Sequence, residues 1–169
     1  MNNIYLIGFM GVGKSAVSRK LHEKTGWETV DTDQLIEQKE GMEISEIFAQ
    51  KGEDYFRKVE RDVVKSLTGK SRMIVACGGG VATKEVNQSE IKKGGTVVLL
   101  SASPQTILER VSRNNRRPLL EGKKTVEDIQ RFLDERTPSY KKCADYTVDV
   151  DNKNLSKIAD EILSFIDLS

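Results

Sequence analysis

The stretch that decides the fold is Gly8-Phe9-Met10-Gly11-Val12-Gly13-Lys14-Ser15. It matches the pattern G-x-x-x-x-G-K-[ST], follows a strand-like run at 4–8 and precedes a segment of helical period. Glycines let such a loop wrap around phosphate groups, and the N-terminus of the following helix favours negative charge. The stretch therefore predicts a phosphate-binding loop, or P-loop, between a strand and a helix.

Outward from this loop, short runs rich in β-branched residues recur at 4–8, 28–31, 73–77, 96–100 and 146–150. Segments of helical period separate them, which implies a parallel sheet. The run at 96–100 is apolar without alternation, as is typical of a strand covered on both faces. We therefore expect the α/β class, as a three-layer sandwich with a five-stranded parallel sheet and a P-loop NTPase core.

The length of 169 residues suits one domain over 1–169, in which two stretches depart from simple alternation. The stretch at about 33–69 adds helix with one apolar stripe and is a candidate substrate lobe; the stripe comprises Phe56, Val59, Val63 and Leu67. The polar, basic stretch at about 113–124 is interpreted as a lid, with an ordinary solvated loop as the alternative. The last segment predicts a helix that packs on the sheet through Leu155, Ile158, Ala159, Ile162 and Ile166.

Charge and targeting signals limit the possible partners. Lys and Arg number 27 against 26 Asp and Glu, so no global field attracts nucleic acid or an anionic membrane. The sequence shows neither a secretory leader nor a membrane-spanning run, and we expect a cytoplasmic monomer. Cys77 and Cys143 form no CxxC pair and are interpreted as small buried hydrophobic residues.

The acceptor side of the site must distinguish a kinase from a nucleotide-dependent switch. Asp31 and Asp33 follow the second strand, at the edge where ligands bind in open α/β sheets. If the chain stays extended there, both carboxylates face the same cleft, one toward a metal and one toward an acceptor hydroxyl. The alternative is that Asp33 only caps the next helix.

Two arginines and a glycine loop are further candidates. Arg57 and Glu60 share a helix face, where a weak surface ion pair is the alternative. Arg136 lies on an apolar stripe and needs an anion, either a ligand carboxylate or an internal partner, although Pro138 could kink the helix. The glycines at 78–80 can expose backbone N–H groups to a ligand or form a plain flexible turn.

Taken in order, these segments resemble the shikimate kinases over nearly the whole chain. The matching pieces are GFMGVGKS at 8–15, DTD at 31–33, the segment 41–60, GGG at 78–80, RRPLL at 116–120 and RTPSY at 136–140. The resemblance implies a fold like that of nucleoside monophosphate kinases, with substrate lobe and lid. It also implies that ATP phosphorylates the 3-hydroxyl of shikimate, giving shikimate 3-phosphate and ADP on the route to chorismate and aromatic amino acids.

The resemblance assigns roles residue by residue. Lys14, Asp33 and Arg117 are the expected catalytic residues, and Ser15 and Asp31 the expected Mg²⁺ site. Shikimate is expected to contact Asp33, Arg57, Gly79, Gly80 and Arg136. ATP is expected to contact Gly11, Val12, Gly13, Lys14, Ser15, Ala16, Arg110, Arg117 and Lys153, although the loop at 151–154 departs most from the family. A gluconate or nucleoside monophosphate kinase and a catalytically silent nucleotide binder are the competing hypotheses.

Overall fold

A computed structural model describes residues 2–112 and 125–166 of the chain. Its sheet has five parallel strands in the order β2-β3-β1-β4-β5: β1 (Asn3–Ile7), β2 (Glu28–Asp31), β3 (Met73–Ala76), β4 (Gly95–Ser101) and β5 (Tyr146–Asp149). The predicted α/β class and the five parallel strands are confirmed, and each predicted strand boundary lies within one residue of the observed one.

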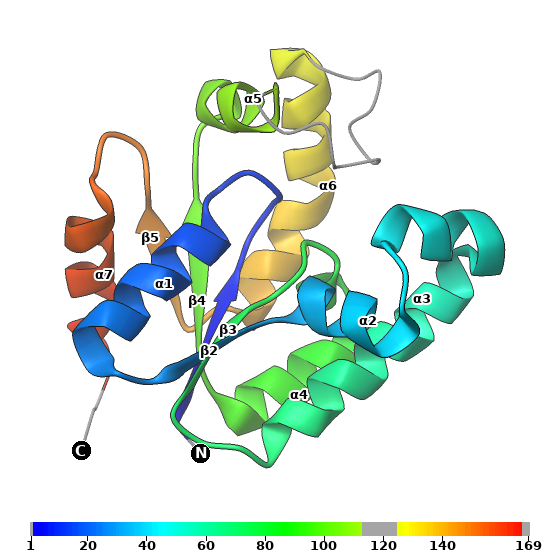
Figure 1. Ribbon diagram of the computed structural model, residues 1–169. Coiled ribbons are helices and arrows are strands. Elements are labelled where there is room, and N and C mark those ends of the chain that lie inside the picture. The colour runs from blue at the N-terminus through cyan, green and yellow to red at the C-terminus, as the bar shows by residue number, and fades with distance from the viewer. Residues whose placement is uncertain (1, 113–124, 167–169) are drawn as a thin grey trace.

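The central strands are buried because helices cover the sheet on both faces. Every residue of β1 and β3 is buried, as are Val97 to Leu100 in β4. α1 (Lys14–Thr25) packs beside α7 (Leu155–Leu163) on one face, and α4 (Glu85–Gly94) and α6 (Val126–Cys143) pack against β4 on the other (Figure 1). The P-loop joins β1 to α1 at the end of the sheet opposite to the two termini (Figure 1).

Two helices begin at side chains that form capping contacts. α5 (Pro104–Ser112) follows Ser103, whose Oγ accepts a hydrogen bond from Thr106 N at 3.3 Å. Thr125 caps α6 by accepting from Asp128 N at 3.1 Å. α6 is helical through Pro138, so this proline does not end it.

The stretch at about 33–69 forms two helices, α2 (Thr32–Glu40) and α3 (Ile44–Thr68), which project from the sheet (Figure 1). They share a small core of their own, made of Ile36, Ile47, Phe56, Val59 and Val63. The predicted apolar stripe is buried throughout, although Leu67 belongs to the main core. α3 is interrupted at Gly52, whose φ of 84° lies in the left-handed region that favours glycine.

The predicted apolar face of the last helix is partly wrong. Ile158, Ala159 and Ile162 are buried against the main core, but Leu155 is 38% exposed. α7 ends at Leu163, so Ile166 packs against the core from the segment beyond the helix. Leu155 is the first residue of α7 and follows the exposed Asn154, and the helix is buried only from Ile158 onward. No helix within the described part of the chain is both long and apolar enough to cross a bilayer.

Both cysteines are free and buried, as expected. Burial raises the pKa of the Cys143 thiol to about 11 and that of Cys77 still further above its ordinary value. Since the thiolate is the reactive form, we expect fewer than about a tenth of the thiols to react with a disulfide reagent in the native protein at mildly alkaline pH. Both should react after unfolding in urea. Rapid reaction of one thiol in the native state would contradict this packing.

Candidate active site

A cleft of about 280 Å³ opens at the carboxyl edge of the sheet. It is lined by residues from the P-loop, α1, the ends of β2 and β3, and α5, namely Met10, Gly11, Gly13, Lys14, Ser15, Ala16, Arg19, Asp31, Asp33, Ala76, Cys77, Gly78, Gly79, Arg110 and Val111. Parallel strands bring these segments together because their carboxyl ends meet at one edge. Most of the predicted phosphate residues and both aspartates therefore face one space, whereas Val12 is buried and does not line it.

The P-loop wraps around the Lys14 side chain. Lys14 Nζ donates hydrogen bonds to the carbonyl oxygens of Gly8 at 2.6 Å and Phe9 at 3.0 Å. Gly13, at the start of α1, has a φ of 98°, and a Cβ there would lie 2.7 Å from Arg110 Nη1. Glycine is therefore required for both backbone conformation and space. The loop holds one ammonium group at the N-terminus of a helix, an arrangement suited to polyphosphate.

Arg110 ties α5 to the P-loop. Its Nη1 donates to Val12 O at 2.7 Å and approaches Gly11 O at 3.4 Å. Lys153, which is also expected to contact ATP, instead pairs with Glu161 at 3.0 Å and is not among the residues that line the cleft. The structure thus brings Arg110 to the P-loop and leaves Lys153 apart from it.

Ser15 and Asp31 meet across the cleft, where Ser15 Oγ donates to Asp31 Oδ2 at 3.0 Å. The other carboxylate oxygen of Asp31 accepts from Asp33 N at 2.9 Å and from Gln34 N at 3.3 Å, which caps α2. The capping residue is therefore Asp31, and the alternative that Asp33 caps this helix is wrong. The chain does not stay extended either, because the helix begins at Thr32.

Asp33 instead lies on the first turn of α2 and faces the loop after β3. A Cβ on Gly78 would collide with its carboxylate, so the absence of a side chain there allows the close approach. Thr32 was not singled out from the sequence, yet it is fully buried and its Oγ1 accepts from Gly78 N at 2.8 Å. No sequence signal marks this contact, because its two partners are 46 positions apart.

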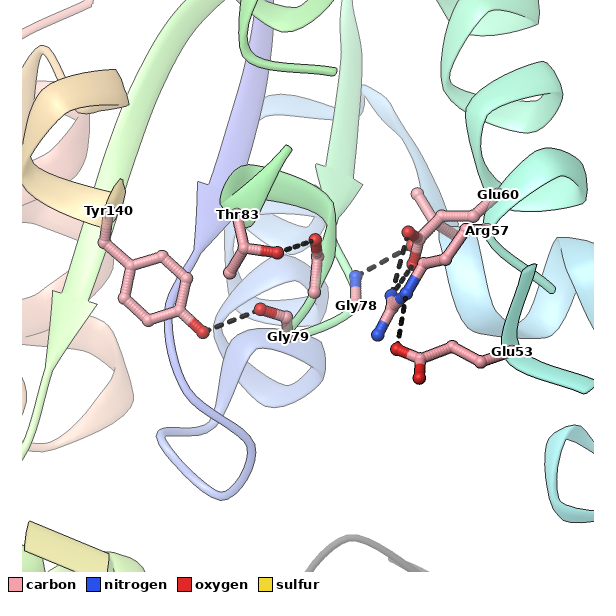
Figure 2. Close-up of polar contacts among 9 residues, drawn as sticks. Glu53, Arg57, Glu60, Gly78, Gly79, Thr83 and Tyr140 are labelled. Carbon is pink, nitrogen blue, oxygen red and sulfur yellow. Dashed lines mark hydrogen bonds and ion pairs between the residues drawn. The ribbon is translucent and has the colours of Figure 1, made fainter. Parts of the chain in front are cut away.

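Arg57 and Glu60 are partners, but the interpretation as a surface ion pair is wrong. Arg57 Nη1 donates to Glu60 Oε1 at 3.0 Å, and the Glu60 side chain is only 1% exposed (Figure 2). Burial raises the pKa of Glu60, and the positive charge of Arg57 opposes that shift. Arg57 Nε is 3.6 Å from Glu53 Oε1 and is buried without a hydrogen-bond partner among the described residues. The guanidinium thus has a fixed orientation, and its Nε faces Glu53 without forming a hydrogen bond to it.

Arg136 lies on α6, across the glycine loop from Arg57. Its guanidinium is 5.5 Å from the centre of the Phe9 ring, and its Nη1 is 3.0 Å from where a Cβ on Gly79 would be. That nitrogen is buried and has no hydrogen-bond partner within 2–112 and 125–166. No carboxylate in these two segments forms an ion pair with Arg136, so the internal partner considered from the sequence is not found there. The predicted lid at 113–124, with Arg117, lies outside the described residues.

Comparisons with known proteins identify the same family. The family model described as Shikimate kinase matches residues 10–167. A protein named shikimate kinase from Thermodesulfovibrio yellowstonii is 41% identical and covers 96% of this chain and 94% of its own. The solved shikimate kinase of Acinetobacter baumannii in complex with shikimate is 36% identical, with a TM-score of 0.92 over 98% of this chain and 92% of that one.

A more distant likeness concerns the fold alone. A solved gluconokinase from Sinorhizobium meliloti has a TM-score of 0.61 and 19% identity, and the match covers 96% of this chain and 90% of that one. The sheet and its helices are therefore shared with a protein described as a gluconokinase. The residues around the cleft, rather than the fold, must distinguish the acceptors.

Proposed function

Because the chain belongs to the shikimate kinase family, we propose that it transfers the γ-phosphoryl group of ATP to the 3-hydroxyl of shikimate. The products are shikimate 3-phosphate and ADP, and the reaction serves the route to chorismate and the aromatic amino acids. Two buried guanidinium nitrogens support this acceptor most directly. Arg57 Nε and Arg136 Nη1 both lack hydrogen-bond partners among the described residues. Buried donors need acceptors, and one carboxylate placed between the two arginines would supply them.

Lys14 and Asp33 act on the two ends of the transfer. Lys14 neutralises charge on the β- and γ-phosphates, while the backbone of Gly11, Val12, Gly13, Ser15 and Ala16 surrounds them. Asp33 accepts the hydrogen bond of the attacking hydroxyl and steers its oxygen in line with the phosphorus. Arg117 is assigned to the transferring phosphate by the family pattern. Positioning contributes most of the catalysis, since the transition state is loose and needs no strong base.

Mg²⁺ fits the oxygen pair formed by Ser15 and Asp31. Ser15 Oγ directs its hydrogen at Asp31 Oδ2, so the lone pairs of the hydroxyl oxygen remain available to a hard cation. Asp31 is itself held by its two capping bonds and orients Ser15 from the outer shell. When bound, the metal would neutralise the β- and γ-phosphates. Among residues 2–112 and 125–166, no cluster of three His, Cys, Asp or Glu side chains could hold a metal.

The two aspartates should be separable by magnesium titration. Asp31→Asn keeps a side chain that can cap α2 and should raise the Mg²⁺ concentration for half-maximal rate by about 10- to 100-fold. Asp33→Asn removes the charge beside the acceptor and should lower turnover by about a hundredfold, with an unchanged Mg²⁺ requirement. Both variants are titrated at saturating ATP and shikimate. Equal shifts in Mg²⁺ dependence and equal losses of maximal rate would show that the pair acts as one unit.

The remaining assignments rest on the family pattern. We place adenine beside Arg110, which contacts the P-loop. We keep Lys153 as a proposed ATP contact although its side chain pairs with Glu161.

The chain is proposed to be one domain, with the substrate lobe at about 33–69 and the lid at about 113–124. We also propose a cytoplasmic monomer, and the two free, buried cysteines agree with a reducing compartment. Light scattering at micromolar concentration measures the oligomeric state.

One coupled assay tests the proposed function. ADP release is measured with ATP, Mg²⁺ and either shikimate, gluconate, a nucleoside monophosphate or no acceptor. We expect turnover with shikimate at least about a hundredfold above that with any other acceptor. A nucleoside monophosphate has no carboxylate to pair the buried donors, and the open chain of gluconate does not hold its carboxylate and hydroxyl in the fixed geometry of a ring acid. Equal or greater turnover with gluconate or a nucleotide would overturn the assignment. ATP binding without turnover on any acceptor would favour the silent nucleotide binder.

A further inference from the structure

The glycine loop at 78–80 is held by side chains and backbone groups from several elements (Figure 2). Thr32 Oγ1 accepts from Gly78 N at 2.8 Å, and Val81 N donates to Gly78 O at 3.1 Å. On the opposite side of the loop, Tyr140 Oη donates to Gly79 O at 2.7 Å. Thr83 Oγ1 donates to Gly80 O at 2.6 Å. Each successive peptide group of the loop therefore has its N–H or its C=O held by a hydrogen bond. The loop is not a plain flexible turn.

Fixing a carbonyl also fixes the N–H group of the same peptide unit. In a trans peptide the C=O of one residue and the N–H of the next point in opposite directions, and no described peptide is cis. The Tyr140 hydroxyl, by holding Gly79 O, consequently sets the direction of Gly80 N–H. Neither Gly79 N nor Gly80 N donates to any of the residues that the structure describes. The loop thus presents two N–H groups whose directions are set by the hydrogen bonds to the carbonyl oxygens of the same peptide groups.

Gly80 N–H points away from Tyr140, toward the side on which Arg57 lies. Arg57 and Tyr140 flank the loop on opposite sides (Figure 2). A Cβ on Gly80 would collide with the Arg57 guanidinium, which shows how closely the arginine approaches this residue. The N–H of Gly80 is therefore directed toward the Arg57 side of the loop, next to the arginine to which the proposed function assigns the shikimate carboxylate.

Tyr140 is well suited to hold this peptide. It is 2% exposed, and its ring belongs to the main hydrophobic core, so the hydroxyl cannot swing away. Burial raises the pKa of Tyr140, so the hydroxyl keeps its proton and donates at physiological pH. One helical turn before it, on the same face of α6, lies Arg136. A single helix thereby carries an arginine for the substrate and a tyrosine for the loop.

We propose that Tyr140 is a positioning residue for the acceptor, whose hydroxyl holds the Gly79–Gly80 peptide so that Gly80 N–H donates to shikimate. This inference rests on the proposed function, since it concerns the same acceptor site. Tyr140→Phe removes only the hydroxyl and keeps the ring in the core. We expect the Michaelis constant for shikimate to rise about three- to tenfold, because one hydrogen bond to the substrate is weakened. The Michaelis constant for ATP should stay unchanged.

Tyr5→Phe is the matched control. Tyr5 is 1% exposed and its hydroxyl accepts from Asn3 Nδ2 at 3.3 Å, but it lies in β1 with no contact to the glycine loop. Tyr5→Phe should leave both Michaelis constants within twofold of the wild type. An unchanged shikimate constant in Tyr140→Phe, or equal changes in the shikimate and ATP constants, would overturn the inference. Absence of shikimate turnover in the wild type would overturn the proposed function and this inference with it.

The Gly80 amide proton supplies a direct readout. In the wild-type protein its NMR signal should shift on addition of shikimate, and the shift should shrink in Tyr140→Phe. An unmoved wild-type signal at saturating shikimate overturns the inference without need of any variant. The Arg136 side chain also lies beside the Tyr140 hydroxyl. If Tyr140→Phe weakened shikimate binding only by disturbing Arg136, the Gly80 signal would still shift fully in that variant. This result would also overturn the inference.

Discussion

Lys14→Met should lower turnover by about a thousandfold while the protein stays folded, because one ammonium group is lost from the site where negative charge develops. Lys14 Nζ donates to the loop carbonyls of Gly8 and Phe9, and the residue is not part of either hydrophobic core. Methionine keeps the length of the side chain. The measurement is the maximal rate at saturating ATP and shikimate, with circular dichroism and the melting temperature as checks of the fold.

Lys20→Met provides the control on the same helix. Lys20 forms an ion pair with Glu23 at 2.8 Å and does not line the cleft. An ion pair of this kind contributes little, so turnover should stay within twofold of the wild type. If Lys14→Met retained turnover within tenfold of the wild type, the assignment of the P-loop to the transferred phosphate would be wrong.

Arg136→Ala should raise the Michaelis constant for shikimate by about 30- to 1,000-fold, since a carboxylate left unpaired at a desolvated site costs several kcal/mol. ATP affinity, measured without shikimate by titration calorimetry, should change little. Arg136→Lys keeps the charge but loses the planar fork, so its effect should lie between those of the wild type and alanine.

Arg131→Ala is the control for this helix. Arg131 also belongs to α6, but its side chain is 70% exposed and pairs with Asp128. Its removal should leave the shikimate constant within twofold of the wild type. A loss of ATP affinity as large as the loss of shikimate affinity in Arg136→Ala would place Arg136 in the phosphate or adenine site.

Much of the fold was predictable from the sequence because its determinants are local. The pattern at 8–15 needs its glycines and lysine at fixed spacing, and the apolar runs at 73–77 and 96–100 need only their own composition to indicate buried strands. The strands of a parallel sheet end at one edge, so the order of the motifs also predicted that the P-loop and the two aspartates would share a cleft.

The roles of individual side chains in the site were decided only by tertiary structure. The spacing of Arg57 and Glu60 is the same for an exposed ion pair as for the buried pair observed, because exposure depends on what packs over a helix face. From the sequence only Asp33 was considered as a cap of the next helix, but the helix begins at Thr32 and makes Asp31 the capping residue. Lys153 follows the last strand, where the resemblance places an ATP contact, yet its side chain pairs with Glu161 on α7.

The glycine loop shows the same division most clearly. Three adjacent glycines at 78–80 predicted available backbone N–H groups, but glycine by itself leaves their directions free. Their directions come from Thr32 and Tyr140, which are 46 and 61 positions away from the glycines they contact. Sequence by itself therefore determined which local conformations the chain could adopt, because propensity and periodicity act over a few residues. Tertiary structure decided where the polar groups point, because hydrogen bonds between distant segments exist only once the sheet has brought those segments together.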